Sequence, residues 1–120
     1  MKAGIILFAH GSREPQWARP FESLAAAVSQ KSGQPVRLAY LELMQPALGD
    51  AIAALIREGM QSIRVVPVFL AAGRHLKDDL PRLIAQFPGV SIDVDPPIGE
   101  QPSVIEAIAA AIARGDRPSP

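Results

Sequence analysis

The chain has 120 residues, 48% of them hydrophobic and 20% charged, a balance that fits one folded domain and excludes a disordered chain. Its 12 basic and 12 acidic residues give a formal net charge of zero, so no overall field draws it to nucleic acid or to an anionic membrane. The chain contains no cysteine, which excludes disulfides, thiolate catalysis and cysteine-ligated metal clusters. Any metal ion must therefore be held by histidines and carboxylates.

The apolar run that opens the chain, at 2–9, is short and ends at His10. A signal peptide needs a longer apolar region with a small-residue cleavage site, and a membrane span needs about 20 apolar residues. We therefore expect a cytoplasmic protein, with neither a membrane nor nucleic acid among its partners.

Four apolar runs lie at 2–9, 36–42, 62–70 and 90–95. They alternate along the chain with four stretches of helical periodicity. Such alternation is typical of parallel βαβ units. The first and third runs are apolar on both faces, as central strands are, whereas the other two alternate like edge strands. Right-handed crossovers then favour a four-stranded parallel sheet of order 2-1-3-4, with helices on both faces in a three-layer αβα sandwich. We expect one such α/β domain over 1–115 and a frayed tail at 116–120.

Each predicted helix carries an apolar stripe at helical spacing. The stripes consist, in chain order, of Phe21, Leu24, Ala25 and Val28; of Leu48, Ala51, Ile52, Leu55 and Ile56; of Leu80, Leu83, Ile84 and Phe87; and of Val104, Ile105, Ile108 and Ile112. Pro20, Pro81 and Pro102 are expected in the first turns of the first, third and fourth helices. Gly59 and Gly115 are expected at the ends of the second and fourth.

Pro67 is unusual within the third apolar run, because it has no N–H to donate to a sheet. It predicts either a bulge or a strand that ends there.

The two histidines of the chain, His10 and His75, follow the two predicted central strands. Ligands of doubly wound sheets bind where the winding direction reverses, outside the carboxyl ends of these strands. A lone histidine is more often a solvated residue than a ligand, but two in the loops that flank this crevice favour a shared functional site.

Charged residues near the two histidines are the next candidates. Glu42 ends the second predicted strand at the same rim, where it serves either the site or only solvation. Asp78 and Asp79 follow His75, and charge stabilisation of the third helix's N-terminus accounts for them.

Positive charge also surrounds the predicted site. Gly11, Ser12 and Arg13 form a weak anion cradle, which lacks the spaced glycines of dinucleotide-binding loops and the Gly-Lys-Ser/Thr end of a P-loop. Arg74 and Lys77 add further charge, which would suit a carboxylate-rich ligand.

Two histidines and one glutamate permit specific chemistry. Neutral imidazole binds cobalt, nickel, iron and zinc, and it also accepts protons. Two histidines and one glutamate are fewer than the four ligands of a closed structural metal site. The coordination positions that stay open suit catalysis or metal transfer.

Three segments, His10–Arg13, Leu41–Pro46 and Val66–Pro81, resemble the sirohydrochlorin cobaltochelatases and ferrochelatases, a class II chelatase-like family, in their short single-domain form. The resemblance covers nearly the whole chain. It implies insertion of Co²⁺ or Fe²⁺, with Ni²⁺ also chemically suitable, into sirohydrochlorin in cobalamin or siroheme biosynthesis, and no permanently bound cofactor.

The same resemblance assigns roles to site residues. It implies that His10 and His75 bind the metal and accept pyrrole protons, assisted by Glu42. Ser12, Arg13, Arg74 and Lys77 are the candidates for binding the macrocycle's carboxylates. Relatives of double length carry two such domains facing one cleft, which implies a homodimer here.

Two alternatives use the same His10. One is a non-catalytic metal carrier or sensor that binds the ion through both histidines. The other is a histidine phosphatase, although residue 9 is Ala where that family's motif has Arg.

Overall fold

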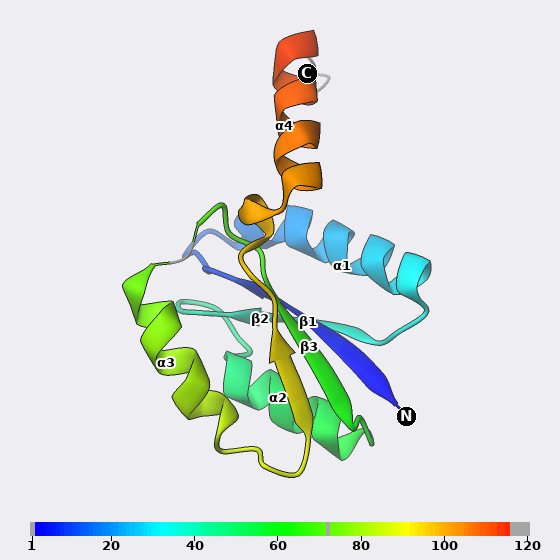
Figure 1. Cartoon of the computed structure of the whole chain (residues 1–120), viewed down its shortest axis with the longest axis vertical. Coiled ribbons are helices and arrows are strands. Elements are labelled where there is room, and N and C mark those ends of the chain that lie inside the picture. The colour runs from blue at the N-terminus through cyan, green and yellow to red at the C-terminus, as the bar shows by residue number, and fades with distance from the viewer. Residues whose placement is uncertain (1, 72, 116–120) are drawn as a thin grey trace.

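The computed structural model describes residues 2–71 and 73–115, with only the backbone described at Arg74 and His75. At its centre, four parallel strands form one sheet in the order β2-β1-β3-β4 (Figure 1). The strands are β1 (Ala3–Ala9), β2 (Val36–Tyr40), β3 (Ser62–Pro67) and β4 (Ser91–Val94). The predicted strand order is confirmed, and the predicted tail at 116–120 lies outside the described residues.

Helices lie on both faces of this sheet, as the sequence predicted. Helix α1 (Arg19–Ser32) covers one face, and α2 (Leu48–Arg57) and α3 (Arg74–Ile84) cover the other (Figure 1). Helix α4 (Pro102–Arg114) instead projects away from the body of the molecule. Short 3-10 helices, η1 (Pro15–Ala18) and η2 (Ile98–Glu100), precede α1 and α4. Within the described chain, none of these helices has the length and apolar character to span a membrane.

The main hydrophobic core lies between the sheet and the α2/α3 layer. Alternate residues of the central strands supply it, and α2 contributes most of its predicted stripe, because one face of the helix is apolar at helical spacing. Its largest fully buried side chains are Ile6, Ile52, Leu55, Ile63 and Val65.

The core on the α1 side is much smaller. Only Ile5, Leu7 and Val66 are buried in it, with partly buried apolar residues of α1 and β2 packed around them. Helix α1 itself contains no buried residue. This face of the sheet is therefore incompletely covered in the described chain.

The start of the third helix corrects a prediction. Helix α3 begins at Arg74, so Pro81 lies inside the helix rather than in its first turn. Asp78 and Asp79 lie in its middle, and its first turn contains no acidic residue. Stabilisation of the helix N-terminus therefore does not account for these two aspartates. Pro81 has no N–H to donate to the carbonyl oxygen four residues earlier in the helix. Because Pro81 is exposed, water can bond that oxygen instead.

Two strands end earlier than their apolar runs. Strand β2 ends at Tyr40, so Glu42 lies two residues beyond it, in the following loop rather than at the strand end. Strand β3 ends at Pro67, which pairs in register with Phe8 and confirms the short-strand alternative over the bulge. The missing N–H of Pro67 thus falls at the last pair of the ladder.

The other predicted helix boundaries are confirmed. Pro20 and Pro102 lie in the first turns of α1 and α4. Gly115 ends α4 in the left-handed conformation, and Gly59 adopts a positive φ just after α2.

Candidate metal-handling site

The loops after β1 and β2 are joined by main-chain hydrogen bonds beyond the end of the strands. The amide of Leu41 donates to the carbonyl oxygen of Ala9 at 2.9 Å, and the amide of Glu42 donates to that of His10 at 3.0 Å. The parallel pairing therefore continues into the loops. It brings His10 and Glu42 together, as the sequence predicted from their positions at one rim.

Gly11 permits this close approach. Its φ of +97° is one that residues with a side chain rarely adopt, and a Cβ atom added there would lie 1.8 Å from the carbonyl oxygen of Glu42. Since only glycine has no Cβ, the adjacency of the His10 and Glu42 loops depends on this position.

The imidazole of His10 is exposed but packs against a buried aromatic ring. Its centroid lies 4.2 Å from that of Phe69, with 36° between the ring planes. Phe69, which is 5% exposed, also contacts Phe8 at a centroid distance of 5.8 Å. One side of the His10 ring is thus supported by the core, because Phe8 and Phe69 both belong to the α2/α3 side. The ring nitrogens of such an exposed, supported imidazole can meet a metal ion or a proton donor.

His75 lies in the first turn of α3, which packs on the same side of the sheet as the His10 and Phe69 rings. The next residue, Leu76, is buried in that core and anchors the turn. The side chains of His75 and Arg74 lie outside the described part of the structure, so their predicted metal and substrate contacts stay predictions. Among the side chains that the structure does describe, no three His, Asp or Glu residues gather at a spacing that could hold a metal ion.

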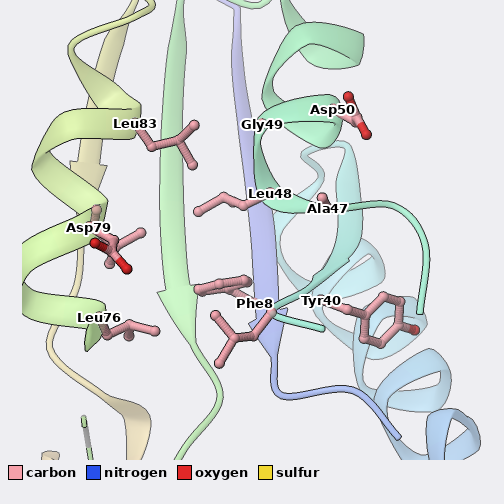
Figure 2. Close-up of a pocket in the computed structure, with 11 residues that line it drawn as sticks. Phe8, Tyr40, Ala47, Leu48, Gly49, Asp50, Leu76, Asp79 and Leu83 are labelled. Atoms are coloured by element: carbon pink, nitrogen blue, oxygen red, sulfur yellow. The ribbon is translucent and has the colours of Figure 1, made fainter. Parts of the chain in front are cut away.

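A cavity of about 420 Å³ between α2 and α3 adjoins the site (Figure 2). Leu76 and Leu83 of α3 extend into it from one side and Leu48 of α2 from the other, with Phe8 of β1 between them (Figure 2). Each predicted site segment contributes to the wall: Phe8 precedes His10 by two residues, Leu41 precedes Glu42, and Leu76 follows His75. The cavity therefore opens an apolar space directly beside the site.

The other sequence-predicted residues have separate surroundings. The hydroxyl of Ser12 accepts a hydrogen bond from the amide of Glu14 at 3.0 Å, so it stabilises its own loop. Arg13 is exposed. Lys77 lines a second cavity of about 250 Å³, between α3 and the end of β4, rather than the larger one. The structure thus brings Ser12 and Arg13, but not Lys77, onto the loop that carries His10.

Sequence reasoning missed the apolar residues around the site. Leu41, Leu43 and Leu70 follow β2 and β3 and are 45%, 57% and 71% exposed. Leu43 also has a φ of +67°, which is rare for a residue with a side chain. Phe69 was likewise missed as the residue beneath His10. Large apolar residues in loops next to polar site candidates were the available signal, since loops otherwise favour polar residues.

Aromatic residues flank the site beyond β2. Trp17 of η1 lies 6.4 Å from Tyr40 and 4.5 Å from Phe21, measured between ring centroids. Burial, with a further contribution from the charge of nearby Glu22, raises the pKa of Tyr40 above its ordinary value. The phenol therefore stays neutral throughout the physiological pH range.

The sequence profile of the CbiX family matches residues 4–115, nearly the whole chain. The chain belongs to the CbiX family. The resemblance to sirohydrochlorin chelatases seen in its motifs is thereby confirmed, and so is the chelatase-like α/β fold.

Named relatives of this CbiX chain include chelatases for two metals. It is 31% identical over 105 residues to the sirohydrochlorin cobaltochelatase of Sulfurisphaera tokodaii, covering 88% of this chain and 87% of that protein. It is 32% identical over 110 residues to the chloroplastic sirohydrochlorin ferrochelatase of Arabidopsis thaliana, covering 88% of this chain but 49% of that protein. The chain therefore spans about half the length of some curated relatives and most of the length of others.

The solved structures that resemble this chain likewise include one of similar length and one of about twice its length. A CbiX protein from Marinobacter aquaeolei, assigned to cobalamin biosynthesis, is 38% identical with a TM-score of 0.79, covering 94% of this chain and 96% of that one. The sirohydrochlorin chelatase SirB of Bacillus subtilis subspecies spizizenii, in complex with cobalt, is 28% identical with a TM-score of 0.79. That match covers 95% of the CbiX chain and 51% of SirB.

Proposed function

We propose that this chain is a sirohydrochlorin chelatase, which inserts Co²⁺ or Fe²⁺ into the macrocycle. The observation that carries the proposal is the position of His10, whose exposed imidazole rests on Phe69 and whose backbone is bonded to Glu42. The family and the relatives with cobaltochelatase and ferrochelatase activity support the same reaction.

Insertion exchanges two pyrrole N–H protons for one divalent metal ion, so the site must hold the ion and remove both protons. We assign metal binding and proton acceptance to His10 and His75, with the Glu42 carboxylate assisting either step. Because only a few protein residues would bind the ion, it is released readily to the four macrocycle nitrogens. The metal is thus a substrate, and neither step requires a permanently bound cofactor.

The surroundings of His10 suit a large, flat and partly charged macrocycle. Leu41, Leu43 and Leu70 offer exposed apolar surface at the same edge of the sheet, and burial of such surface favours binding of a tetrapyrrole face. Arg13 supplies positive charge on the His10 loop for the carboxylates of sirohydrochlorin. Arg74 and Lys77 are further candidates on α3.

We propose that two copies act together, since the chain covers about half of the SirB and chloroplast relatives. Two copies would then enclose the macrocycle from both sides.

Metal insertion is followed by the absorbance change of sirohydrochlorin with Co²⁺, Fe²⁺ and Ni²⁺ in parallel. We expect activity from the native chain, a loss of about 100-fold or more in His10→Ala and His75→Ala, and a smaller loss in Glu42→Gln. Gly89→Ala is the matched control, because Gly89 has open space around it.

The other outcomes separate the alternatives. Stoichiometric metal binding without insertion of any metal would identify a carrier or sensor. Full activity in both histidine variants would refute the site assignment, whereas release of phosphate from phosphorylated substrates would identify a phosphatase. The relative rates with the three metals decide which of them the chain prefers.

A further inference from the structure

The loop between β1 and η1 starts and ends against the same short segment of the chain. At its start, the amide of Glu42 donates to the carbonyl oxygen of His10 at 3.0 Å. At its end, the ring of Trp17 lies 6.4 Å from that of Tyr40, measured between centroids, which is within the range of packed aromatic pairs. Tyr40 is the last residue of β2 and precedes Glu42 by two residues. Both ends of the loop are therefore tied to residues 40–42.

Hydrogen bonds inside the loop order its middle on either side of Arg13. The amide of Glu14 donates to the hydroxyl oxygen of Ser12 at 3.0 Å. The amide of Trp17 donates to the carbonyl oxygen of Glu14, also at 3.0 Å. Arg13 lies exposed within this bonded segment. With both ends of the loop held, the backbone that carries the Arg13 charge keeps little conformational freedom.

Trp17 provides the tie at the far end of the loop. Tyr40 is 6% exposed and so offers a fixed surface, whereas η1 contains no buried residue. The ring of Trp17 also lies 4.5 Å from that of Phe21, near the start of α1, measured between centroids. Burial in a hydrophobic core does not hold η1 in place, so the ring contacts of Trp17 fix this segment against β2.

The supports of His10 and of Arg13 are separate, although both residues lie on one loop. The His10 ring packs on Phe69, which belongs to the core on the α2/α3 side. Trp17 packs against Tyr40 instead. Loss of the Trp17 contacts should therefore free the part of the loop around Arg13 and leave the His10 ring supported.

We propose that Trp17 is a positioning residue for substrate binding: by packing on Tyr40, it holds the loop so that Arg13 meets a carboxylate of sirohydrochlorin. This inference rests on the proposed function, in which Arg13 binds the macrocycle. A loop that is ordered before binding lowers the entropic cost of forming such a contact. Trp17 touches neither the metal nor the reacting nitrogens, so its loss weakens binding and leaves turnover of the bound macrocycle nearly unchanged.

The first test compares Trp17→Ala with Trp17→Phe and with Gln16→Ala. Gln16 is the exposed neighbour of Trp17 in η1, so Gln16→Ala is the matched control. The dissociation constant of metal-free sirohydrochlorin is measured from the absorbance of the macrocycle, and kcat and KM from the insertion of Co²⁺. We expect Trp17→Ala to raise the dissociation constant and KM about tenfold with kcat within about twofold of native, because the loop must then be ordered on binding. Trp17→Phe, which keeps a ring against Tyr40, and Gln16→Ala should stay within about twofold of native in all three.

Arg13→Gln decides whether Trp17 acts through Arg13. We expect Arg13→Gln to raise the dissociation constant, and the addition of Trp17→Ala to raise it by less than about twofold more. Additive effects of the two substitutions would overturn the proposal. Native affinity in Arg13→Gln would do the same, as would a loss of kcat at unchanged KM in Trp17→Ala.

Trypsin reports on the loop in the absence of substrate. Arg13 is the cleavage site in this stretch, because Arg19 is followed by Pro20, before which trypsin does not cut. We expect cleavage after Arg13 to be about fivefold faster in Trp17→Ala than in the native chain, since a mobile exposed loop is cleaved first. Trp17→Phe and Gln16→Ala should be cut at the native rate. Equal rates in Trp17→Ala and the native chain would overturn the proposal.

Two further measures keep these tests decisive. Urea unfolding of each variant shows whether it is folded. Trp17→Leu, which keeps apolar bulk but no ring, takes the place of Trp17→Ala if the latter does not fold, and the same results are expected of it. Absence of insertion by the native chain would refute the proposed function, while the binding and cleavage measurements would still decide the role of Trp17.

Discussion

The carbonyl oxygen of His10 accepts a hydrogen bond from the amide of Glu42, and Gly11 lies in the same contact. The imidazole and the carboxylate therefore belong to one main-chain unit rather than to two independent loops. Changes at Gly11 should disturb both residues together.

Gly11→Ala should destabilise the protein by about 2 kcal/mol or more and abolish metal insertion. The added Cβ meets the Glu42 carbonyl, and its positive φ is costly for any residue with a side chain. Urea unfolding and the insertion assay measure the two effects. Gly89→Ala should change stability by less than about 0.5 kcal/mol, and equal behaviour of the two variants would contradict the role of Gly11.

Phe69→Leu should lower the rate of metal insertion by about tenfold while the protein stays folded, because the imidazole of His10 loses its aromatic support. The ring-current shift of the His10 protons in the NMR spectrum should also disappear, with His75→Ala used to assign the two histidines. Phe8→Leu is the control, since it changes the same core without removing the ring beneath His10. An unchanged His10 spectrum in Phe69→Leu would refute this contact.

Leu43→Asn should raise the stability by about 0.5–1 kcal/mol, because asparagine tolerates the left-handed conformation better than leucine. If the exposed leucine contacts the macrocycle, the same change should raise the KM for sirohydrochlorin. Thermal unfolding and steady-state kinetics measure the two effects. A more stable variant with an unchanged KM would exclude Leu43 from the substrate surface.

Tyr40→Phe should remove part of the alkaline loss of stability. The folded state holds the pKa of Tyr40 above its ordinary value, so the neutral phenol's contribution is complete below about pH 10 and is lost as the pH rises through the folded pKa. Phenylalanine cannot ionise. Urea unfolding between about pH 8 and pH 11 should therefore show a shallower decline for the variant, and parallel curves would contradict the prediction.

The sheet and two of its covering helices could be predicted from local pattern. Strand order followed from the alternation of apolar runs with helices and from the handedness of crossovers, and α2 followed from a regular stripe. The start of α3 could not be predicted in this way. Pro81 is typical of a first turn, but Leu76 packs into the core and extends the helix back to Arg74, so tertiary packing outweighed the local preference.

The adjacency of the His10 and Glu42 loops could be predicted, but the contacts that support the His10 ring could not. Topology alone brings the ends of β1 and β2 to one edge, which was sufficient to associate His10 with Glu42. The contact between His10 and Phe69 depends on the path of the loop after β3, and no periodic pattern specifies such a path. The direction of α4 was equally hidden, because a stripe shows which face of a helix is apolar but not which surface covers it.

The hydrogen bonds that extend the strand pairing past Ala9 and Tyr40 involve only backbone atoms. Side chains in these loops can therefore be exchanged while the main chain keeps its course, provided that Gly11 stays. At this edge of the sheet the backbone positions are fixed, whereas the side chains of the loops can be substituted. On the proposed function, selectivity for a metal or for a macrocycle would be redesigned at Leu41 and Glu42 without rebuilding the fold.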